Sequence, residues 1–573
     1  MELHAALIAF WAHRAATARV PAAAAIIPAL AALISGAWIV RYFGTTEAVF
    51  LEPTLPVIGF GCTTIALVLS AAFGAAGRPL TLIVIAFLTF GFLGQFAPGI
   101  TSLAPTEFTS YITYLAYGSD GLFGRALDII SNIVLVFIIF GVFFDVAGGG
   151  RVVANIALRL AARSRASAIK ACVLASGLFG TVSGAATSNV MTSGAFSIPS
   201  MRRIGVRNET AAGIEAAAST CGQIMPPVLG AAAFFLADLV SASYGTVVIA
   251  SIAPALFCYY AFFRQADRVP LAPSQDGAEE APEPLSPRYL LYLLPPAAIL
   301  YFLMQSSAFV SLAAIAGAAA CLAIAIPLIG LRETAARLWQ KLPDLMVSAM
   351  HLIIVAASVG LLLGVLYSTG LAIAGAVWIG KIGESNLLLA LVLTGISAFV
   401  LGMGVATVGV YIVAATLLAP GLISAGIPPM AAHFFVLYCG ILSMITPPVA
   451  FASLAASALA KADFTATSLQ AMRFGWILFA MPFLIALQPG LVMSGTLPEI
   501  ALALFTVFIF ITIATSQARG PLRAAMLALS GGAILLGNAP AASMLLSCAA
   551  ITPLVVEWFR SESRHRLTKA DMR

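Results

Sequence analysis

Charged residues are scarce in this sequence. Asp, Glu, Lys and Arg make up 9% of the 573 residues, 61% of the residues are hydrophobic, and the mean hydropathy is +1.03. Because a soluble domain ordinarily carries about 25% charged residues, a water-soluble globular protein is excluded. Apolar windows of about 17–25 residues, each long enough to cross a bilayer as a helix, recur along the chain. A signal peptide or a single anchor does not account for them, so the sequence predicts an all-α polytopic membrane protein.

The signatures of enzymes, metal centres and nucleic-acid binding are also missing. The seven cysteines stand singly in apolar runs without CxxC or CxxH spacing, which predicts small core residues rather than zinc or redox chemistry. No GxSxG, HExxH or paired-aspartate motif occurs, which disfavours an intramembrane enzyme. The net charge of +6 comes from basic residues scattered in short loops, and this pattern indicates membrane topology rather than nucleic-acid binding.

The apolar segments predict the membrane topology. We expect about 14 transmembrane helices, near residues 22–40, 54–76, 79–98, 125–147, 209–243, 246–264, 289–306, 308–331, 344–368, 431–460, 472–488, 496–516, 520–537 and 539–558. Two further segments, residues 171–199 and 387–420, are rich in small and hydroxyl residues and end in Pro, and we expect each to form a re-entrant hairpin. With a cytoplasmic N-terminus, all Lys and Arg residues except Arg41, Arg125 and Lys381 then lie on the cytoplasmic side, as the positive-inside rule requires.

A pattern of Pro and Gly occurs twice in the chain, and one constant offset relates every member of the two copies. The motif P-x5-G-x20-P-P occurs at Pro199, Gly205, Pro226 and Pro227, and again at Pro420, Gly426, Pro447 and Pro448. Each copy follows an expected amphipathic surface helix, at residues 148–170 and 370–383, and an expected hairpin. Five expected crossings separate the copies, and an odd number inverts the second copy in the membrane. Paired broken segments in inverted repeats are typical of secondary transporters, whose substrate site lies near the bilayer midplane; alternating access is therefore favoured over an open channel pore.

Each proline pair is expected to break a helix. Pro cannot donate the helical hydrogen bond, so we expect carbonyl groups upstream of Pro226 and Pro447, around Thr220 to Gly222 in the first copy, to lose their partners. Inside a membrane such carbonyls must face protein, water or an ion. Backbone carbonyls and the negative ends of half-helices suit a hard cation such as Na+.

Small polar residues gather at the hairpin tips and at the breaks. The first tip and break contain Ser183, Gly184, Thr187, Ser188 and Asn189, followed by Ser219, Thr220, Cys221, Gly222 and Gln223; the second contain Gly402, Gly404, Thr407 and Tyr411, followed by Ser443 and Thr446. Any one of these residues is also what tight helix packing in membranes requires. Taken together, the four segments predict cation or substrate binding.

Two carboxylates flank the first break without an obvious basic neighbour, namely Glu215 and Asp238. Intramembrane carboxylates are costly and often functional, so either one binds a cation or carries a proton. The alternative is that Asp238 lies at the outer surface and Glu215 pairs with Arg or backbone near the inner surface. His433 is expected to be a hydrogen-bonded core residue, and Asp145 is expected to cap a helix on the cytoplasmic side.

At these residues the chain resembles the fused membrane subunit of TRAP transporters, in particular the TAXI subgroup. The matching runs are GLFGTVSGAATSNVMTSGAFSIPSMRRIG, EAAASTCGQIMPPVLGAAAFFLAD and HFFVLYCGILSMITPPVAFASLAASALAKAD. The resemblance covers about residues 105–470. Cys221 departs from it, since relatives commonly have Gly there.

The resemblance implies a Na+-driven elevator transporter, multi-pass in the bacterial inner membrane and working as a monomer, with a small organic anion delivered by a periplasmic substrate-binding protein. The implied Na+ ligands are Ser183, Gly184, Ser188, Asn189, Thr220 and Gly222 in one half, and Gly402, Gly404, Thr407, Ser443 and Thr446 in the other. The substrate would lie between the tips, near Ser183, Ser188, Asn189, Gln223, Thr407 and Thr446. The alternative is a stand-alone dicarboxylate-type symporter, driven by Na+ or by protons, which needs no binding protein.

The repeat and the resemblance together divide the chain into five parts. In chain order these are small-subunit-like helices and the start of the scaffold (1–104), a first inverted repeat with hairpin 171–199 and broken helix 209–243 (105–264), an acidic, Pro-rich cytoplasmic linker (265–288), a second inverted repeat with hairpin 387–420 and broken helix 431–460 (289–470), and C-terminal helices with a basic cytoplasmic tail (471–573).

Overall fold

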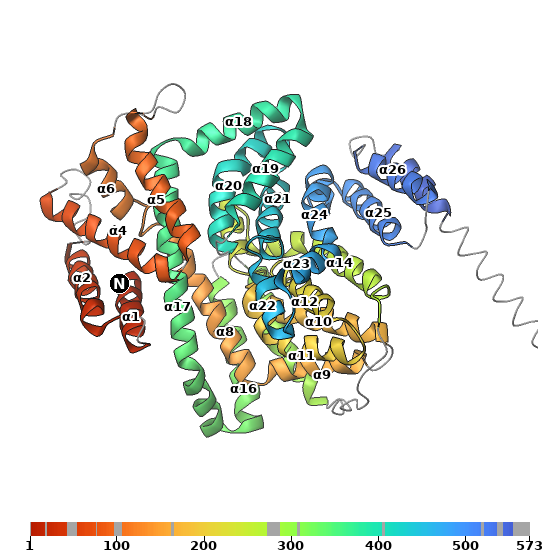
Figure 1. The fold of residues 1–573 in the computed structure, drawn as a ribbon, viewed down its shortest axis with the longest axis horizontal. Helices are drawn as coiled ribbons and strands as arrows, with labels where there is room; N and C mark the ends of the chain where they lie inside the picture. Colours follow the sequence, from red (N-terminus) through yellow and green to blue (C-terminus); the bar gives the residue numbers. More distant parts are fainter. Residues whose placement is uncertain are drawn as a thin grey trace, which may run out of the picture.

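All regular secondary structure in the described part of the chain is helical, which confirms the expected all-α class (Figure 1). The computed structural model describes residues 2–17, 20–42, 54–75, 77–96, 103, 106–161, 165–271, 287–305, 310–403, 407–516, 521–535 and 542–553. Most of the expected linker and the basic tail therefore lie outside the described residues.

Ten helices in these ranges are long and apolar enough to cross a membrane, or eleven if one bent pair counts as a single span. The expected number of about 14 also counted two broken segments as crossings, and the expected crossings at 520–537 and 539–558 lie partly outside the described residues. The segment 209–243 consists of α12 (Asn208–Gly222) and α13 (Ala232–Leu239), and the segment 431–460 consists of α21 (Pro429–Ile441) and α22 (Phe451–Ala460). Each of these helices is shorter than the roughly 20 residues that a full crossing requires.

Five N-terminal helices form a separate group around one side of a long helix, α17 (Leu331–Ser368) (Figure 1). They are α1 (Glu2–Ala16), α2 (Ala22–Tyr42), α4 (Leu55–Ala75), α5 (Arg78–Leu93) and α6 (Phe108–Tyr117). The sequence did not predict α1 or α6, because neither is long enough for a crossing. Helix α1 buries Leu3, Leu7 and Phe10, whose spacing places them on one helix face, and it packs against α2 and α17.

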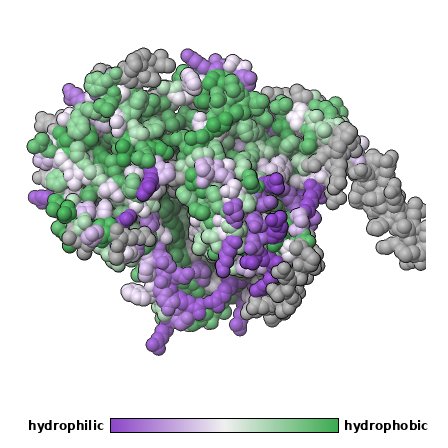
Figure 2. Space-filling view, in the orientation of Figure 1, coloured by the Kyte–Doolittle hydropathy of each residue, from purple (hydrophilic) through white to green (hydrophobic). Residues whose placement is uncertain are grey.

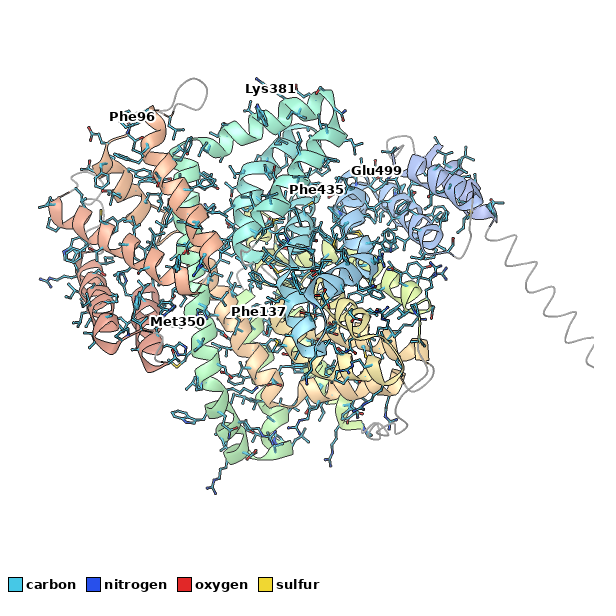
Figure 3. The ribbon with its side chains drawn as sticks, in the orientation of Figure 1. Phe96, Phe137, Met350, Lys381, Phe435 and Glu499 are labelled. Atoms are coloured by element: carbon cyan, nitrogen blue, oxygen red, sulfur yellow. The ribbon has the colours of Figure 1, made fainter. Side chains whose placement is uncertain are left out.

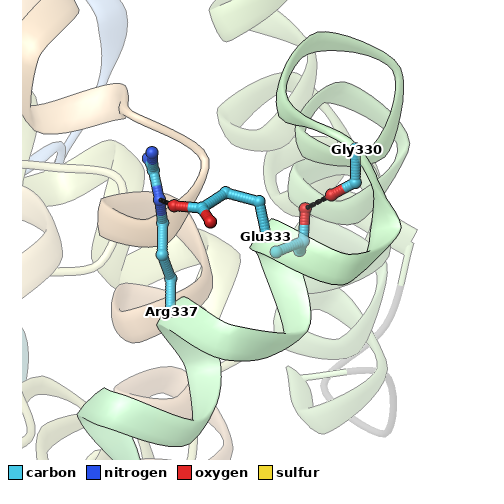
Figure 4. A network of polar contacts seen from close by, with 4 residues as sticks. Gly330, Glu333 and Arg337 are labelled. Atoms are coloured by element: carbon cyan, nitrogen blue, oxygen red, sulfur yellow. Dashed lines mark hydrogen bonds and ion pairs between the residues drawn. The ribbon is translucent and has the colours of Figure 1, made fainter.

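Helix α17 is much longer than the expected crossing at residues 344–368, since it spans 38 residues. It starts directly after a turn at Gly330, whose φ of 88° lies in the region that favours glycine. There the Thr334 hydroxyl donates to the Gly330 carbonyl at 2.8 Å, and Arg337 Nε donates to Glu333 Oε1 at 2.8 Å (Figure 4). The tight turn leads the chain back from α16 (Val310–Ile329), which packs against α17.

The secondary structure repeats at the offset found in the sequence. Helix α11 (Ala186–Arg203) corresponds at both ends to α20 (Thr407–Ser424). The turns that follow contain Gly205 with φ 94° and Gly426 with φ 95°. Beyond the breaks, the non-glycine residues Leu229 and Ala450, which the same offset relates, both have positive φ. The proline bonds of both pairs are cis. The sequence motif thus marks two copies of one backbone pattern.

The two copies contain the same succession of helices. The first copy consists of the surface helix α9 (Gly149–Ala161), the hairpin of α10 (Arg165–Ser183) and α11, the broken helix of α12 and α13, and α14 (Tyr244–Ala266). The second copy consists of the surface helix α18 (Leu371–Ser385), the hairpin of α19 (Leu387–Leu401) and α20, and the broken helix of α21, the short turn η7 (Leu442–Met444) and α22. It ends with the bent pair α23 (Phe464–Phe474) and α24 (Trp476–Leu487). Helical hairpins are present at both expected positions, and a helix is present at each expected surface position; the re-entrant course of the hairpins in the membrane stays a prediction. The first surface helix is shorter than the expected 148–170, since residues from Arg165 onward belong to the hairpin.

The surface helices lie at opposite ends of the molecule, α9 at the lower end and α18 at the upper end of Figure 1. Lys381 of α18 stands at the upper end (Figure 3). Hydrophilic residues gather at the lower end, around α9 and the lower ends of α16 and α17, whereas the upper body is mostly apolar (Figure 2). This polarity agrees with a cytoplasmic lower end rich in Lys and Arg.

The helix before the first surface helix contains a local irregularity. It begins as α7 (Arg125–Ile129), continues as a π-helical turn η4 (Ile130–Val134) and ends as α8 (Leu135–Val146). Phe137 of α8 packs against Phe234 of α13, with ring centroids 5.1 Å apart. The remaining described helices are η2 (Gly94–Phe96), η5 (Pro287–Leu293), α15 (Leu294–Gln305), η8 (Pro489–Val492), α25 (Leu497–Ala514), α26 (Pro521–Leu535) and the apolar helix Ala542–Pro553.

Candidate functional site

Glu215 of α12 is buried in a cage of serine hydroxyls. Its side chain is 1% exposed. Ser176 and Ser219 donate to Oε1 at 3.0 and 2.9 Å, Ser193 also donates to Oε1, and Ser197 donates to Oε2. The donors come from α10, α11 and α12 itself. Pairing of Glu215 with Arg or backbone, one of the two alternatives considered from the sequence, is wrong because hydroxyl groups provide its hydrogen bonds.

The serine cage continues into the tip of the first hairpin through Asn189. Asn189 Nδ2 donates to the Ser176 carbonyl at 2.8 Å, and the Ser193 hydroxyl donates to the Asn189 carbonyl at 2.8 Å. Asn189 is fully buried. Its side chain therefore lies on the inner face of α11, together with the cage.

Two glycines allow the hairpin to approach the broken helix closely. A Cβ atom built on Gly180 of α10 would lie 2.4 Å from the Gly222 Cα, and one built on Gly222 would lie 2.8 Å from the Gly180 Cα. The same atom on Gly222 would lie 3.1 Å from Asn189 Nδ2. The structure thus brings together Asn189 and Gly222, two of the predicted cation ligands.

The carbonyl groups before the first proline pair are not free, contrary to expectation. The carbonyls of Thr220, Cys221 and Gly222 accept bonds of 3.3, 3.1 and 3.2 Å from the N–H groups three residues later. The end of α12 tightens into 3₁₀-type turns, which is a common way to satisfy the carbonyls at a helix end. A carbonyl oxygen has two lone pairs, so these groups still have one acceptor position for a ligand. The Thr220 hydroxyl donates to the Ala216 carbonyl at 2.8 Å.

The second tip and its break also meet. A Cβ atom on Gly402 would lie 2.8 Å from both the Gly440 carbonyl and the Ser443 hydroxyl. Ser443 donates to the Gly440 carbonyl at 2.8 Å, and Thr446 donates to the Leu442 carbonyl at 2.8 Å. The structure thus places Gly402 beside Ser443, as expected for a shared site. Gly404 lies outside the described residues, and the side chain of Ser183 in the first tip is likewise not described.

The two halves are joined by Thr407 and Gln223. The Thr407 hydroxyl, at the start of α20, donates to Gln223 Oε1 at 2.8 Å. Gln223 Nε2 is buried and has no hydrogen-bond partner among the described residues. Beside it lies a void of about 10 Å³, lined by Gly184, Gly230 and Thr407 among others, which is close to the space that one water molecule needs. Gln223 and Thr407, both predicted substrate-binding residues, are therefore neighbours, and both line this void.

Ser188 faces away from this centre. It is exposed and lines, together with Thr192, a cavity of about 400 Å³ between α8 and α17 on one side and the first hairpin on the other. Lys341 of α17 and Asp145 of α8 form an ion pair of 2.9 Å in the cavity wall. Ser188 and Asn189 thus contribute to different sites, because neighbouring residues point to different faces of a helix. The carboxylate of Asp145 thus pairs with Lys341, and its expected role as a helix cap stays a prediction.

Asp238 lies at the surface. It pairs with Arg125 of α7 at 3.7 Å, and the two side chains are 40% and 71% exposed. The surface alternative for this carboxylate is confirmed. His433 is buried and its Nδ1 atom lies 2.8 Å from the Tyr411 hydroxyl, as expected for a hydrogen-bonded core histidine. Cys548 is exposed, so the expectation that all cysteines are core residues is wrong for this one.

The sequence analysis missed three serines of the cage, Ser176, Ser193 and Ser197. A helical spacing of four residues relates Ser193 to Ser197, and Glu215 to Ser219. Residues four apart share a helix face, and this periodicity was a usable signal for a polar face on α11 and α12. The contribution of Ser176 from α10 required the packing of the hairpin.

Comparisons with known proteins place the chain in a family. Residues 64–500 match the family described as tripartite ATP-independent periplasmic transporter, DctM component. No curated protein matches the sequence. Among solved structures, the chain is similar to the YdaH transporter of Alcanivorax borkumensis, described as having an unusual topology, with a TM-score of 0.41 and 15% identity over 72% of this chain and 98% of that chain. Because the family match covers most of the sequence, this polytopic protein belongs to the DctM component family of the tripartite ATP-independent periplasmic transporters.

Proposed function

We propose that this chain is a Na+-driven secondary transporter that imports a small organic anion delivered by a periplasmic substrate-binding protein. The observation that carries this proposal is that each half of the repeat contains one hairpin tip and one helix break that faces it. Such paired half-helices present backbone groups and small polar side chains for ions and substrate near the bilayer midplane. The TAXI subgroup and the bacterial inner membrane belong to this proposal.

The proposed cation ligands lie at the two tip-and-break pairs. In the first, Asn189 and Gly222 meet beside the carbonyls of the tightened turn. In the second, Gly402 meets Ser443. The carbonyl and hydroxyl oxygens at these pairs suit a hard monovalent cation, whereas the Asn189 atom nearest Gly222 is the Nδ2 donor. Gln223 and Thr407 lie between the pairs, and the unpartnered amide N–H of Gln223 is a donor suited to an anionic substrate.

We further propose an elevator movement, with two groups of helices moving against each other. The hairpins and broken helices form the transport unit, and α7, α8, α16 and α17 with the N-terminal helices form the scaffold. The cavity of about 400 Å³ lies along this boundary, between α8, α17 and the first hairpin. Its wall contains Lys341 of α17, Asp145 of α8 and Gly150 of α9, and α9 lies at the lower end (Figure 1), where hydrophilic residues gather (Figure 2). This position suits a route that opens to the cytoplasm.

The test is uptake by the purified full chain in proteoliposomes. Radiolabelled monocarboxylic and dicarboxylic acids are supplied with an inward NaCl or choline chloride gradient, with and without a secreted substrate-binding protein encoded beside this chain. We expect uptake of at least one acid only when NaCl and the binding protein are both present. Uptake that needs the NaCl gradient alone supports the stand-alone symporter, and uptake driven by a pH gradient supports the proton-coupled alternative. Uptake that ignores all three overturns the proposal.

A further inference from the structure

Glu215 has no cationic partner in the described part of the chain. The ion pairs found there involve other carboxylates, and the groups around Glu215 are the four serine hydroxyls. A carboxylate is an acceptor with room for about four hydrogen bonds, and four hydroxyl groups lie within hydrogen-bonding distance of it, although the single O–H of Ser193 is shared with the Asn189 carbonyl. Hydroxyl groups carry no net charge, however, and a buried carboxylate without a counter-charge is costly within a membrane.

The cage itself has no room for a cation. The Ser176 and Ser219 hydroxyls lie 2.9 Å apart, and each lies about as far from Glu215 Oε1. A cation of the size of Ca2+, which Na+ resembles, keeps its oxygen ligands at about 2.3–2.6 Å, and this forces neighbouring ligands farther apart than hydrogen-bonded oxygens. When the Glu215 carboxyl group is ionised, its balancing charge therefore lies outside the cage.

The hydrogen bonds of the cage connect Glu215 to one neighbouring site for that charge, at Asn189 in the first hairpin. Ser176 binds Glu215 through its hydroxyl and Asn189 Nδ2 through its carbonyl, and Ser193 binds Glu215 and the Asn189 carbonyl. Asn189 in turn lies against Gly222 at the break. Asn189 thus connects the Glu215 carboxylate to the first proposed cation site, and its hydrogen bonds with the cage serines fix the orientation of its amide group.

The second half has no equivalent of this cage. At the offset that relates the two copies, Ser176 corresponds to another serine, Ser397, but Glu215 corresponds to Val436, and the serines at 193, 197 and 219 correspond to Ala414, Leu418 and Gly440. The repeat otherwise preserves helix ends, turn glycines and proline pairs. The carboxylate is therefore a property of the first site alone.

We propose that Glu215 is a positioning and charge-compensating residue for a monovalent cation at the first hairpin tip. Its carboxylate offsets the charge of the bound cation, and the Ser176 and Ser193 bridges hold Asn189 in place beside Gly222. The two cation sites of the transporter then differ, with charge compensation built into the first and only neutral ligands in the second. This inference rests on the proposed Na+-driven function.

The test measures the Na+ response of the full chain in detergent, apart from transport. Thermal unfolding is followed against NaCl, with choline chloride at equal ionic strength as control, for the wild type and for Glu215→Gln and Glu215→Asp. We expect Glu215→Gln to raise the NaCl concentration for half-maximal stabilisation on the order of tenfold, and Glu215→Asp to restore most of the response. Ser443→Ala, in the second site, is the matched comparison. The part of the stabilisation by NaCl that Glu215→Gln removes is expected to remain in Ser443→Ala.

The outcomes separate the two proposals. If the wild type shows no difference between NaCl and choline chloride, the proposed Na+ coupling itself fails. If the wild type responds and Glu215→Gln lowers the unfolding temperature equally in both salts, without changing the half-maximal NaCl concentration, Glu215 is only a structural residue and the inference is overturned. Should Glu215→Gln not fold, Ser193→Ala removes the hydroxyl that bridges Glu215 and the Asn189 carbonyl, and an unchanged half-maximal concentration in that variant also overturns the inference.

Discussion

The Thr407 hydroxyl donates a hydrogen bond of 2.8 Å to the side-chain carbonyl of Gln223. Thr407 begins the second arm of the second hairpin, and Gln223 caps the helix before the first break. This bond joins the two halves of the repeat at the point where the proposed substrate site lies. The Nε2 atom of Gln223 is a buried donor without a hydrogen-bond partner among the described residues. Gln223 and Thr407 also line the small void.

Loss of the Thr407 hydroxyl should impair transport more than stability. Thr407→Val keeps the shape of the side chain but leaves both polar atoms of the Gln223 amide without a partner. A buried polar group that loses its hydrogen bond costs about 1–3 kcal/mol in desolvation free energy. We expect a raised KM for substrate in proteoliposome uptake. Thr416→Val is the control, because the Thr416 hydroxyl on the same helix is buried and has no partner among the described residues; an equal effect of both substitutions would contradict a specific role for Thr407.

Added volume at the first helix crossing should separate the hairpin from the break. Gly180→Ala places a methyl group 2.4 Å from the Gly222 Cα, so the backbones must move apart, at a cost of about 1–3 kcal/mol. We expect a lower unfolding temperature and a weaker response to NaCl.

Gly395→Ala is the matched control for this substitution in the first arm of the second hairpin. The nearest atoms to its added Cβ would be the Cys439 sulfur and a Phe435 ring carbon, each at 3.5 Å, which are ordinary contacts. We expect nearly wild-type unfolding. Equal destabilisation by both substitutions would show that the Gly180 crossing is not specially close. Phe435 lies toward the upper end of the molecule in Figure 3.

The two faces of α11 should differ in chemical accessibility. In a background with the exposed Cys548 replaced by Ala, we expect Ser188→Cys to react with a water-soluble maleimide applied from the cytoplasmic side, because Ser188 lines the large cavity. Ser193→Cys should remain unreactive, since position 193 is buried in the cage. Labelling of position 188 only from the periplasmic side would overturn the assignment of the cavity to the cytoplasmic end.

The surface carboxylate should be dispensable. Asp238→Asn removes the ion pair with Arg125, and such exposed pairs contribute about 0–1 kcal/mol. We expect an unfolding temperature and an uptake rate close to those of the wild type. A loss of uptake comparable to that of Glu215→Gln would show that Asp238 has a transport role that its surface position does not indicate.

Much of the architecture could be predicted because it depends on local backbone chemistry. Long apolar runs satisfy their backbone groups as helices within a membrane, and Pro interrupts a helix wherever it stands. The motif that includes Gly205 and Pro226 therefore located both hairpins and both breaks, and its recurrence at Gly426 and Pro447 marked the repeat. The number of crossings depends on how a broken segment is counted, since a break and a crossing have similar hydropathy.

The contacts of the site could not be read from the sequence to the same degree. Ser188 and Asn189 are neighbours in the chain, yet one faces the cavity and the other the Glu215 cage, and the rotation of α11 against its neighbours decides which. Ser176 reaches Glu215 only because α10 folds back against α12.

The sequence by itself determined the membrane class, the repeat and the places where helices break, because hydropathy and the geometry of Pro and Gly act within a few residues along the chain. The tertiary structure alone decided that four hydroxyls surround Glu215, that Thr407 meets Gln223 across the two halves, and that Lys341 neutralises Asp145. These pairings join residues far apart in the chain, and they depend on the crossing angle, rotation and depth of packed helices, which no local pattern specifies.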